Sequence, residues 1–285
     1  MTKNKHLFYY AIGPIIGGLF QLVALQILSW LFESNFVGML SLVLIVTNFS
    51  LLIFSLGLDQ SLAREFHHHE DKTLLLINAL FPGLIFLIIF LIVLFSFSPD
   101  ALSYALFDIS SFEAGILVAS CICFEFCIRF LSLQLRMHEK AFEYSLIQII
   151  PRLVFLILII LFFLILDFER DFILLIYLHT FSVLSALFFS FILNIRITQN
   201  FKINFEKSIF LKLFKFGAPL IISGIAIWGI NSFDKVILRT TEQFDQLALV
   251  SIAVTLGYGA TFLSSIFNTI WTPLVYKWDA KGMDM

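Results

Sequence analysis

Charged side chains are scarce in this 285-residue sequence, where Asp, Glu, Lys and Arg together make up 13% of the residues. Soluble globular domains carry about 25% charged residues, so this scarcity excludes an ordinary soluble domain. Hydrophobic residues instead reach 60%, phenylalanine alone contributes 36 residues, and the mean hydropathy is +0.99. The formal net charge is only −2, which argues against a nucleic-acid partner. The composition is that of a protein embedded in lipid.

Cysteine is also rare, and its three copies, Cys121, Cys123 and Cys127, lie within one apolar stretch. This spacing gives neither a disulfide framework nor a closed zinc site, so we interpret the three as small apolar packing residues. The run 67–71, three histidines followed by Glu and Asp, invites a metal interpretation. Consecutive helical residues diverge by about 100° each and do not converge on one ion, which favours ordinary loop histidines. We therefore predict no metal and no cofactor.

Long apolar runs dominate the rest of the chain. The first run is longer than the core of a signal peptide and lacks a small-residue cleavage site, so we expect a spanning helix there. Because an open strand leaves unpaired backbone groups in lipid, each run of this length is expected to cross as a helix. The sequence therefore predicts an all-α integral membrane protein with about eight transmembrane helices, at approximately residues 7–32, 36–58, 74–97, 112–135, 142–166, 172–193, 213–235 and 247–270.

The basic residues lie mainly in every second connection between these runs. Of the 18 Lys and Arg residues, 13 fall on one side, 3 on the other, and 2 within runs. Since cytoplasmic loops are enriched in Lys and Arg, this asymmetry predicts that both termini are cytoplasmic. The larger group comprises Lys3, Lys5, Arg64, Lys72, Arg136, Lys140, Arg196, Lys202, Lys207, Lys212, Lys215, Lys277 and Lys281, and the smaller one Arg170, Lys235 and Arg239.

Two similar openings suggest an internal duplication. Lysines precede Gly13-Pro14 near the N-terminus and Gly217-x-Pro219 about two hundred residues later, and an apolar run follows each. Between them, the basic stretch 194–214 is either an amphipathic segment along the cytoplasmic interface or a simple basic linker. We therefore divide the chain into an N-terminal six-helix lobe (1–193), this linker (194–214) and the start of a second lobe (215–285).

The order of several short motifs resembles that of the polysaccharide flippases, the O-antigen and exopolysaccharide repeat-unit transporters of the multidrug/oligosaccharidyl-lipid/polysaccharide exporter superfamily. The motifs are Gly57-Leu58-Asp59 followed by Leu62-Ala63-Arg64-Glu65, then Gly217-x-Pro219-Leu220, Asn231-x-x-Asp234-Lys235 and Trp271-x-Pro273-x-x-Tyr276. The resemblance spans the whole chain. It implies two six-helix lobes around a central cavity, the second of which ends here after two helices, as expected of a truncated chain or fragment.

The resemblance also implies an activity. A flippase moves an undecaprenyl-diphosphate-linked oligosaccharide, such as an O-antigen, capsule or exopolysaccharide repeat unit, from the cytoplasmic to the outer leaflet of the bacterial inner membrane by alternating access. Its partners would be this lipid-linked oligosaccharide, the bilayer and other polysaccharide-assembly proteins. Such transport requires no covalent chemistry, so the chain is not expected to be an enzyme. It requires cations facing a water-filled cavity to stabilise the diphosphate.

Ionisable residues within apolar runs are the candidates for this role, because they are costly in lipid and usually face a cavity or a partner. Arg152 lies about 15 Å into its helix after Pro151, and we favour a cavity position for it. Arg129 follows Glu125 by four positions, on the same helix face. These two either face the cavity or neutralise each other within the bundle.

Other candidates lie near the ends of the runs. Arg64, in a loop with Asp59 and Glu65, is either solvated or involved in substrate admission and gating. Asn231, Asp234 and Lys235 close the seventh run, where they are candidates for an outer gate or ion coupling; interfacial snorkelling is the alternative for Lys235.

Three other functions are compatible with parts of the sequence. An ion-coupled multidrug exporter of the same superfamily would use Glu125 as its buried acid. A non-transporting membrane subunit would fit the incomplete second lobe. A membrane-embedded polysaccharide polymerase or glycosyltransferase is disfavoured, because the outward connections are short and leave no room for an active site outside the bilayer.

Overall fold

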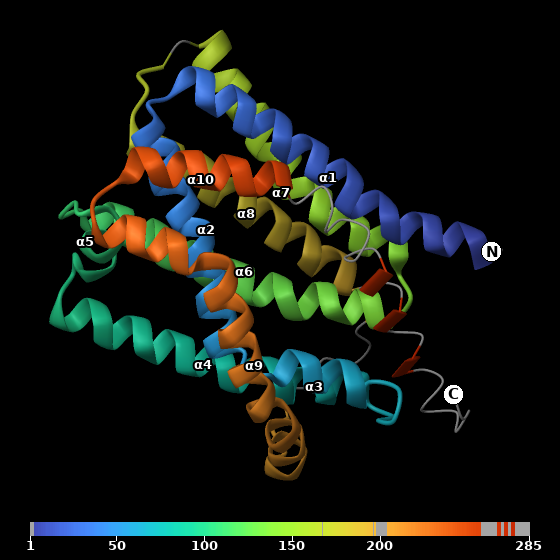
Figure 1. The fold of residues 1–285 in the computed structure, drawn as a ribbon. Coiled ribbons are helices and arrows are strands. Elements are labelled where there is room, and N and C mark those ends of the chain that lie inside the picture. The colour runs from blue at the N-terminus through green and yellow to red at the C-terminus, as the bar shows by residue number, and fades with distance from the viewer. Residues whose placement is uncertain are drawn as a thin grey trace.

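The computed structural model describes residues 3–166, 168–195, 197, 204–257, 267–268, 271–272 and 275–276, with the side chains of 3–8 excepted. The described elements are all helical, which confirms the predicted fold class (Figure 1). Seven of the described helices are long and apolar enough to cross a membrane. They are α1 (Lys3–Leu31), α2 (Ser34–Phe54), α4 (Lys72–Phe97), α6 (Phe112–Met137), α7 (Ala141–Ile159, continued by the π-helix η1, Ile160–Ile165), α8 (Phe172–Ile195) and α9 (Lys207–Thr240).

The eighth predicted run begins as α10 (Phe244–Gly257), an apolar helix of 14 residues. The rest of that run, up to residue 270, lies mostly outside the described residues, as do Pro273 of the predicted loop motif and residues 277–285. Residues 207–214, the end of the predicted linker, form the first turns of α9. Ile209, Phe210 and Leu213 pack against the core there, which favours a helix; the division of the chain into two lobes and a linker stays a prediction.

Two connections predicted as loops contain short helices. Residues Leu58–Glu65 form α3, and Ala101–Phe107 form α5. Leu58 and Leu62 are fully buried on one side of α3, while its charged residues lie elsewhere on the helix. Packing of this apolar side against the bundle stabilises a helix that is too short to be stable in isolation.

The helices pack as antiparallel and crossing neighbours. Helix α1 lies along α7, α6 along α8, and α10 along α2 (Figure 1). Small residues allow the closest of these contacts: a Cβ added to Gly13 of α1 would lie 2.9 Å from the backbone of Ser145 in α7. Close packing at small residues is a general means of helix association in lipid. Away from these contacts, α4 exposes an apolar surface, including Ile89 and Ile92, as a lipid-facing helix does.

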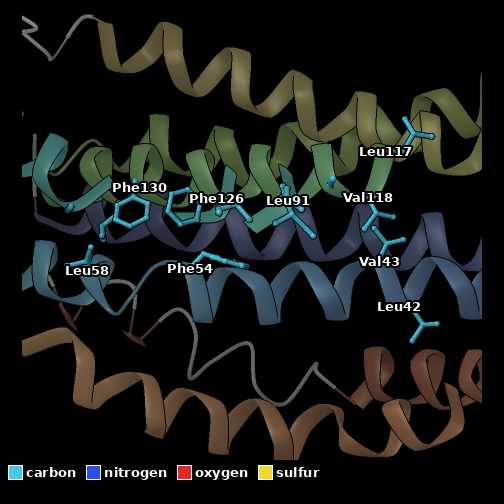
Figure 2. Packing of buried hydrophobic residues seen from close by; sticks show 14 of the residues in the cluster. Leu42, Val43, Phe54, Leu58, Leu91, Leu117, Val118, Phe126 and Phe130 are labelled. Atoms are coloured by element: carbon cyan, nitrogen blue, oxygen red, sulfur yellow. The ribbon is translucent and has the colours of Figure 1, made fainter. Parts of the chain in front are cut away.

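The main core lies between α2, α4 and α6. Phe54 of α2 and the adjacent rings of Phe126 and Phe130 in α6 fill its centre, beside Leu58 at the start of α3 (Figure 2). The Phe126 and Phe130 ring centroids are 5.1 Å apart. Since these side chains are almost fully buried, they fix α3 against the bundle.

The bundle has two distinct ends. One carries α5 and the turns that lead into α2, α8 and α10; the other carries α3, the N-terminus and the start of α9 (Figure 1). We call them the α5 end and the α3 end. At the α3 end, the fully buried Asn78 of α4 accepts a hydrogen bond from the backbone N–H of Glu206 over 2.8 Å. This bond fixes the chain just before α9 begins.

A histidine also packs at the α3 end, in the turn between α6 and α7. The ring of His138 meets that of Phe66 edge-on at 4.8 Å. Burial lowers the pKa of His138, and the positive charges of Lys72 and Lys140 lower it further, while a hydrogen bond with the Gln134 carbonyl opposes them. The neutral ring is therefore the form that fits this site.

Candidate functional site

Asp59 owes its position to the turn between α2 and α3. Gly57 has φ +68°, in the left-handed region that glycine adopts without steric cost. Together with Leu56, at φ +53°, this residue ends α2 and lets α3 begin at Leu58, and the Asp59 side chain that follows is buried in the bundle. Only 8% of that side chain is exposed. A carboxylate buried to this extent needs a cation or hydrogen-bond donors.

Arg129 of α6 is the partner. Its Nε and Nη2 both donate to Asp59 Oδ2, over 3.0 and 2.7 Å. The Arg129 side chain remains 53% exposed, although helices surround it. The structure therefore does not pair Arg129 with Glu125, the alternative that the four-residue spacing allowed. Asp59 neutralises part of the guanidinium while half of its surface stays accessible.

The exposed part of Arg129 faces a cavity of about 200 Å³. Four helices contribute to it: α2, α3, α6 and α9. Both polar and apolar groups line the cavity, namely Asn48, Leu51, Leu52, Ser55, Gly57, Asp59, Gln60, Arg129, Leu220 and Ile221. Two of the predicted site residues, Asp59 and Arg129, thus meet where α2, α3 and α6 face α9. The cavity can hold an anion against Arg129.

The α3 helix joins the first lobe to α9 beside this cavity. Its turn at Gly57 touches α9 backbone to backbone: a Cβ added to Gly217 would lie 2.5 Å from the Gly57 carbonyl oxygen. The Ser61 hydroxyl donates to the Leu213 carbonyl over 2.7 Å. We call this contact the α3–α9 joint. Glycine is needed at both positions, because a side chain would separate the two backbones.

Charged residues of α3 add two further contacts to the α3–α9 joint. The guanidinium of Arg64 lies 4.3 Å from the centroid of the Phe216 ring, a cation–π contact. Glu65 forms an ion pair with Lys212. The sequence placed Arg64 and Glu65 in a loop, whereas the structure places them on α3, in contact with α9. This position is compatible with the predicted gating role of Arg64, which stays a prediction.

A second, separate group of ionisable residues lies inside the first lobe. Arg152 of α7 packs against α1, where a Cβ on Gly17 would lie 3.2 Å from its Cδ. Glu125 of α6 is near enough to Arg152 for an electrostatic interaction, without a direct ion pair between the two. Neither residue lines the cavity beside Arg129. The predicted contact of Arg152 with substrate therefore stays a prediction.

The motif that closes the seventh run lies in the second half of α9. Asn231 and Asp234 are exposed, whereas Lys235 is 8% exposed. Protein covers most of the Lys235 side chain, but its ammonium nitrogen is not one of the buried polar atoms without a partner, so the snorkelling alternative for Lys235 stays a prediction. Asp234 accepts a hydrogen bond from the backbone N–H of Lys235 over 2.8 Å, which is a local bond along the helix.

One residue at the α5 end was not among the predicted site residues. Arg239 donates hydrogen bonds to the carbonyls of Tyr104 and Ala105 over 2.8 and 3.1 Å, and lies 4.0 Å from Asp108. It thus joins the end of α9 to α5. In the sequence, Arg239 is only one of three Lys and Arg residues on the predicted outward side. Its partners lie more than 130 positions away, so no local pattern pointed to them.

The cysteines and histidines form no site in the described part of the chain. Cys121, Cys123 and Cys127 are free thiols, and Cys121 packs at 3.2 Å from the Thr180 hydroxyl. Within the residues that the structure describes, no group of three His, Cys, Asp or Glu side chains is placed to hold a metal ion.

Comparisons with known proteins give a family and a fold. A family model described as "Polysaccharide biosynthesis protein" matches residues 4–276. Among curated proteins, no sequence matches this chain. Several solved structures of transporters share the fold of this chain.

An outward-facing multidrug resistance MATE family transporter of the MOP superfamily is 16% identical, with a TM-score of 0.61 over 98% of this chain and 68% of that one. A MOP superfamily transporter from Pyrococcus furiosus, described by a reverse polarity of its binding pocket, has a TM-score of 0.59, 16% identity and the same coverage. A MATE in complex with Br-NRF has a TM-score of 0.58 and 14% identity over 97% of this chain and 73% of that one. At these identities the likeness concerns the fold.

Proposed function

Because this chain belongs to the polysaccharide biosynthesis protein family, we propose that it moves a lipid-linked oligosaccharide across the bilayer. The family and the fold are those of membrane transporters. The proposed cargo is a repeat unit carried on undecaprenyl diphosphate, and the proposed location is the bacterial inner membrane. Transport would proceed without covalent chemistry, by exposing one binding cavity alternately to the two sides of the membrane.

The observation that carries this proposal is the half-exposed guanidinium of Arg129 in the cavity that α9 closes. A diphosphate is acceptor-rich and anionic, and a guanidinium binds it through several N–H donors in one plane. Asp59 holds Nε and Nη2 and thereby orients the group. The remaining N–H groups of Arg129, which lines the cavity, are available to an anion there.

Asp59 has a second consequence for the cargo. A fully buried lone cation would bind a diphosphate tightly and release it slowly. With Asp59 at 2.7 Å, the pair is close to neutral, so an incoming diphosphate gains hydrogen bonds while competing with a carboxylate that stays in place. This arrangement favours reversible binding, which transport requires.

Two contacts of α9 correspond to two gates in this proposal. The α3–α9 joint lies beside the cavity, and the Arg239 contacts join α9 to α5 at the opposite end of the bundle. The distribution of Lys and Arg supports a cytoplasmic location for the α3 end in this proposal. Opening the α3–α9 joint would then admit cargo from the inner leaflet, and opening the Arg239 contacts would release it outward.

The proposal is tested by reconstituting the full chain in liposomes with a fluorescent isoprenyl-diphosphate-linked sugar. Addition of a reductant that does not cross the bilayer measures the fraction of probe in the outer leaflet. We expect Arg129→Gln to reduce the flipping rate at least tenfold and Arg129→Lys to retain part of it. Lys207→Gln, which removes an exposed charge from α9, is the matched control. Wild-type liposomes that flip no faster than protein-free ones would refute the function.

A second candidate is an ion-coupled multidrug exporter. The solved neighbours include a multidrug resistance transporter, and Glu125 is an acid inside the first lobe without a direct ion pair. For the Pyrococcus furiosus transporter, however, a binding pocket of reversed polarity is described as suggesting a different function. The sign of the charge in the cavity therefore helps to distinguish the two candidate functions. Here that charge is the cation Arg129. Loss of drug efflux from cells in Glu125→Gln, with efflux present in the wild type, would favour the exporter instead.

A further inference from the structure

The cavity beside Arg129 is small compared with the cargo that we propose for it. Its volume is about 200 Å³, whereas pockets that enclose a drug-sized ligand measure about 300–1,000 Å³. A repeat unit of several sugars is at least the size of such a ligand and exceeds this volume. With the diphosphate at Arg129, the contacts of the cavity are therefore limited to groups close to the phosphates, namely the first sugar and the first isoprene unit.

Two exposed carboxamides line this cavity, Asn48 from α2 and Gln60 from α3. Asn48 follows Ser34, the first residue of the spanning helix α2, by 14 positions, which is about 21 Å along the helix. Polar side chains at such a depth are costly in lipid, and they usually face a cavity or a partner. Asn48 faces the same cavity as Arg129.

Both carboxamides have hydrogen-bonding groups to spare. The Asn48 Nδ2 donates to the Leu44 carbonyl of its own helix over 2.8 Å. A carboxamide carries two N–H donors and one oxygen acceptor, so this bond leaves Asn48 one N–H and the Oδ1. No hydrogen bond joins the Gln60 carboxamide to another of the residues that the structure describes. Each side chain therefore offers the cavity a donor and an acceptor together.

Of the three parts of the proposed cargo, the sugar is the one that matches such a group. An isoprenyl chain has no hydrogen-bonding atoms, and an ionised diphosphate only accepts, whereas a sugar hydroxyl or acetamido group both donates and accepts. The other polar groups of the cavity are already bonded. Arg129 donates to Asp59, and the Ser55 hydroxyl donates to the Leu52 carbonyl over 3.4 Å. The two carboxamides are thus the neutral groups that fit a sugar.

We propose that Asn48 and Gln60 determine specificity for the first sugar of the lipid-linked oligosaccharide, through hydrogen bonds to its hydroxyl or acetamido groups. This inference rests on the proposed function and adds a selective contact to it. Arg129 binds the diphosphate that all such carriers share, and the two carboxamides distinguish the sugar attached to it. The later sugars of the repeat unit stay outside the cavity and add nothing to binding at this site.

Binding of carriers with and without a sugar tests this inference. The full chain is placed in phosphatidylcholine nanodiscs and titrated with radiolabelled farnesyl diphosphate, either unmodified or with one N-acetylglucosamine attached. We expect the sugar to tighten binding to the wild type about fivefold or more, as two added hydrogen bonds would. The double variant Asn48→Leu/Gln60→Met should lose this gain and still bind the unmodified probe as the wild type does.

The substitutions suit this test because both side chains are exposed and neither bonds to another helix. The matched control is Gln26→Leu, which removes an exposed carboxamide from α1 that does not line the cavity. It should keep the gain from the sugar. If the double variant melts at a lower temperature than the wild type, Asn48→Ser/Gln60→Ser takes its place, and the same result is expected of it.

Two results for the double variant would overturn the inference. One is an undiminished gain from the sugar. The other is an equal weakening of both probes, because the carboxamides would then contact the diphosphate instead. A third probe, with three sugars attached, should bind the wild type no more tightly than the probe with one. Tighter binding would show that later sugars are also bound, which would overturn the restriction to the first sugar.

The variant Arg129→Gln separates this inference from the proposed function. If Arg129→Gln weakens both probes, but the wild type binds the two equally, the first-sugar site is refuted and the proposed function stands. If the wild type binds neither probe, both are refuted.

Discussion

The Arg129–Asp59 ion pair predicts that its two members differ in their contribution to stability. The Asp59 side chain is 8% exposed, whereas that of Arg129 is 53% exposed and faces the cavity. Arg129→Met would leave a buried carboxylate without a partner. Asp59→Asn would leave a guanidinium that water in the cavity can hydrate. We therefore expect Arg129→Met to be the more destabilising substitution.

The magnitudes follow from this exposure. Breaking a fully buried ion pair by removing one partner costs about 3–5 kcal/mol. Because half of Arg129 is exposed, we reduce this value to about 2 kcal/mol for Arg129→Met. Asp59→Asn loses a charge-assisted hydrogen bond without burying a charge, at a cost of about 1 kcal/mol. The double variant should cost less than the sum of the two, since no unpaired carboxylate remains.

Thermal unfolding of the four proteins in one detergent, at one protein concentration, measures this difference. The melting temperature should fall most for Arg129→Met, less for Asp59→Asn, and should partly recover in the double variant. Equal losses for the two single variants, or a larger loss for Asp59→Asn, would refute the assignment of Asp59 as the desolvated member. Strict additivity would show that the two side chains do not interact.

Further predictions concern other parts of the chain. Gly217→Ala should lower the melting temperature because its Cβ meets the Gly57 backbone, whereas Gly229→Ala, with open space around it, should leave it unchanged or raise it. Folding lowers the pKa of His138 below its usual value of 6.5, so on acidification the unfolded chain binds a proton at this histidine before the folded chain does. The free energy of unfolding is therefore greatest above pH 6.5 and falls as the pH drops toward the lower pKa of the folded state. His138→Gln should therefore reduce the drop in melting temperature between about pH 7.5 and pH 5; an unchanged drop would contradict it. In the liposome assay, Arg152→Ala should lower transport more than Arg152→Lys, and equal losses with normal membrane insertion would indicate packing alone.

The spanning helices could be predicted from sequence because their signal is local. About 20 consecutive apolar residues suffice, and the seven runs through 235 each became a described helix. The short helix α3 gave no such signal. Its eight residues are stable because Leu58 and Leu62 pack into the core and Ser61 bonds to α9, and those partners lie elsewhere in the chain.

The partner of Arg129 illustrates the same limit within the site. Glu125 is one turn away on the same helix, and such pairs contribute about 0.2–0.5 kcal/mol. Asp59 is 70 positions away in sequence, but it is buried, and two hydrogen bonds from one guanidinium satisfy it. The energy of pairing a desolvated carboxylate exceeds that of the local pair. Helical spacing therefore offered Glu125 as one possible partner and gave no signal for Asp59.

The three cations at membrane depth meet the cost of burial in different ways, and the differences bear on function. Arg129 has a bonded carboxylate and a hydrated cavity; Arg152 has the nearby charge of Glu125 and close packing against Gly17. Lys235 has neither within the described residues: protein covers all but 8% of the residue, but its ammonium nitrogen is not one of the buried polar atoms without a partner. An ammonium that reaches solvent needs no counter-charge, so the interfacial position of Lys235 stays a prediction. Of these three cations, Arg129 is the one whose guanidinium both meets a carboxylate and lines the cavity, and the proposed function therefore rests on it.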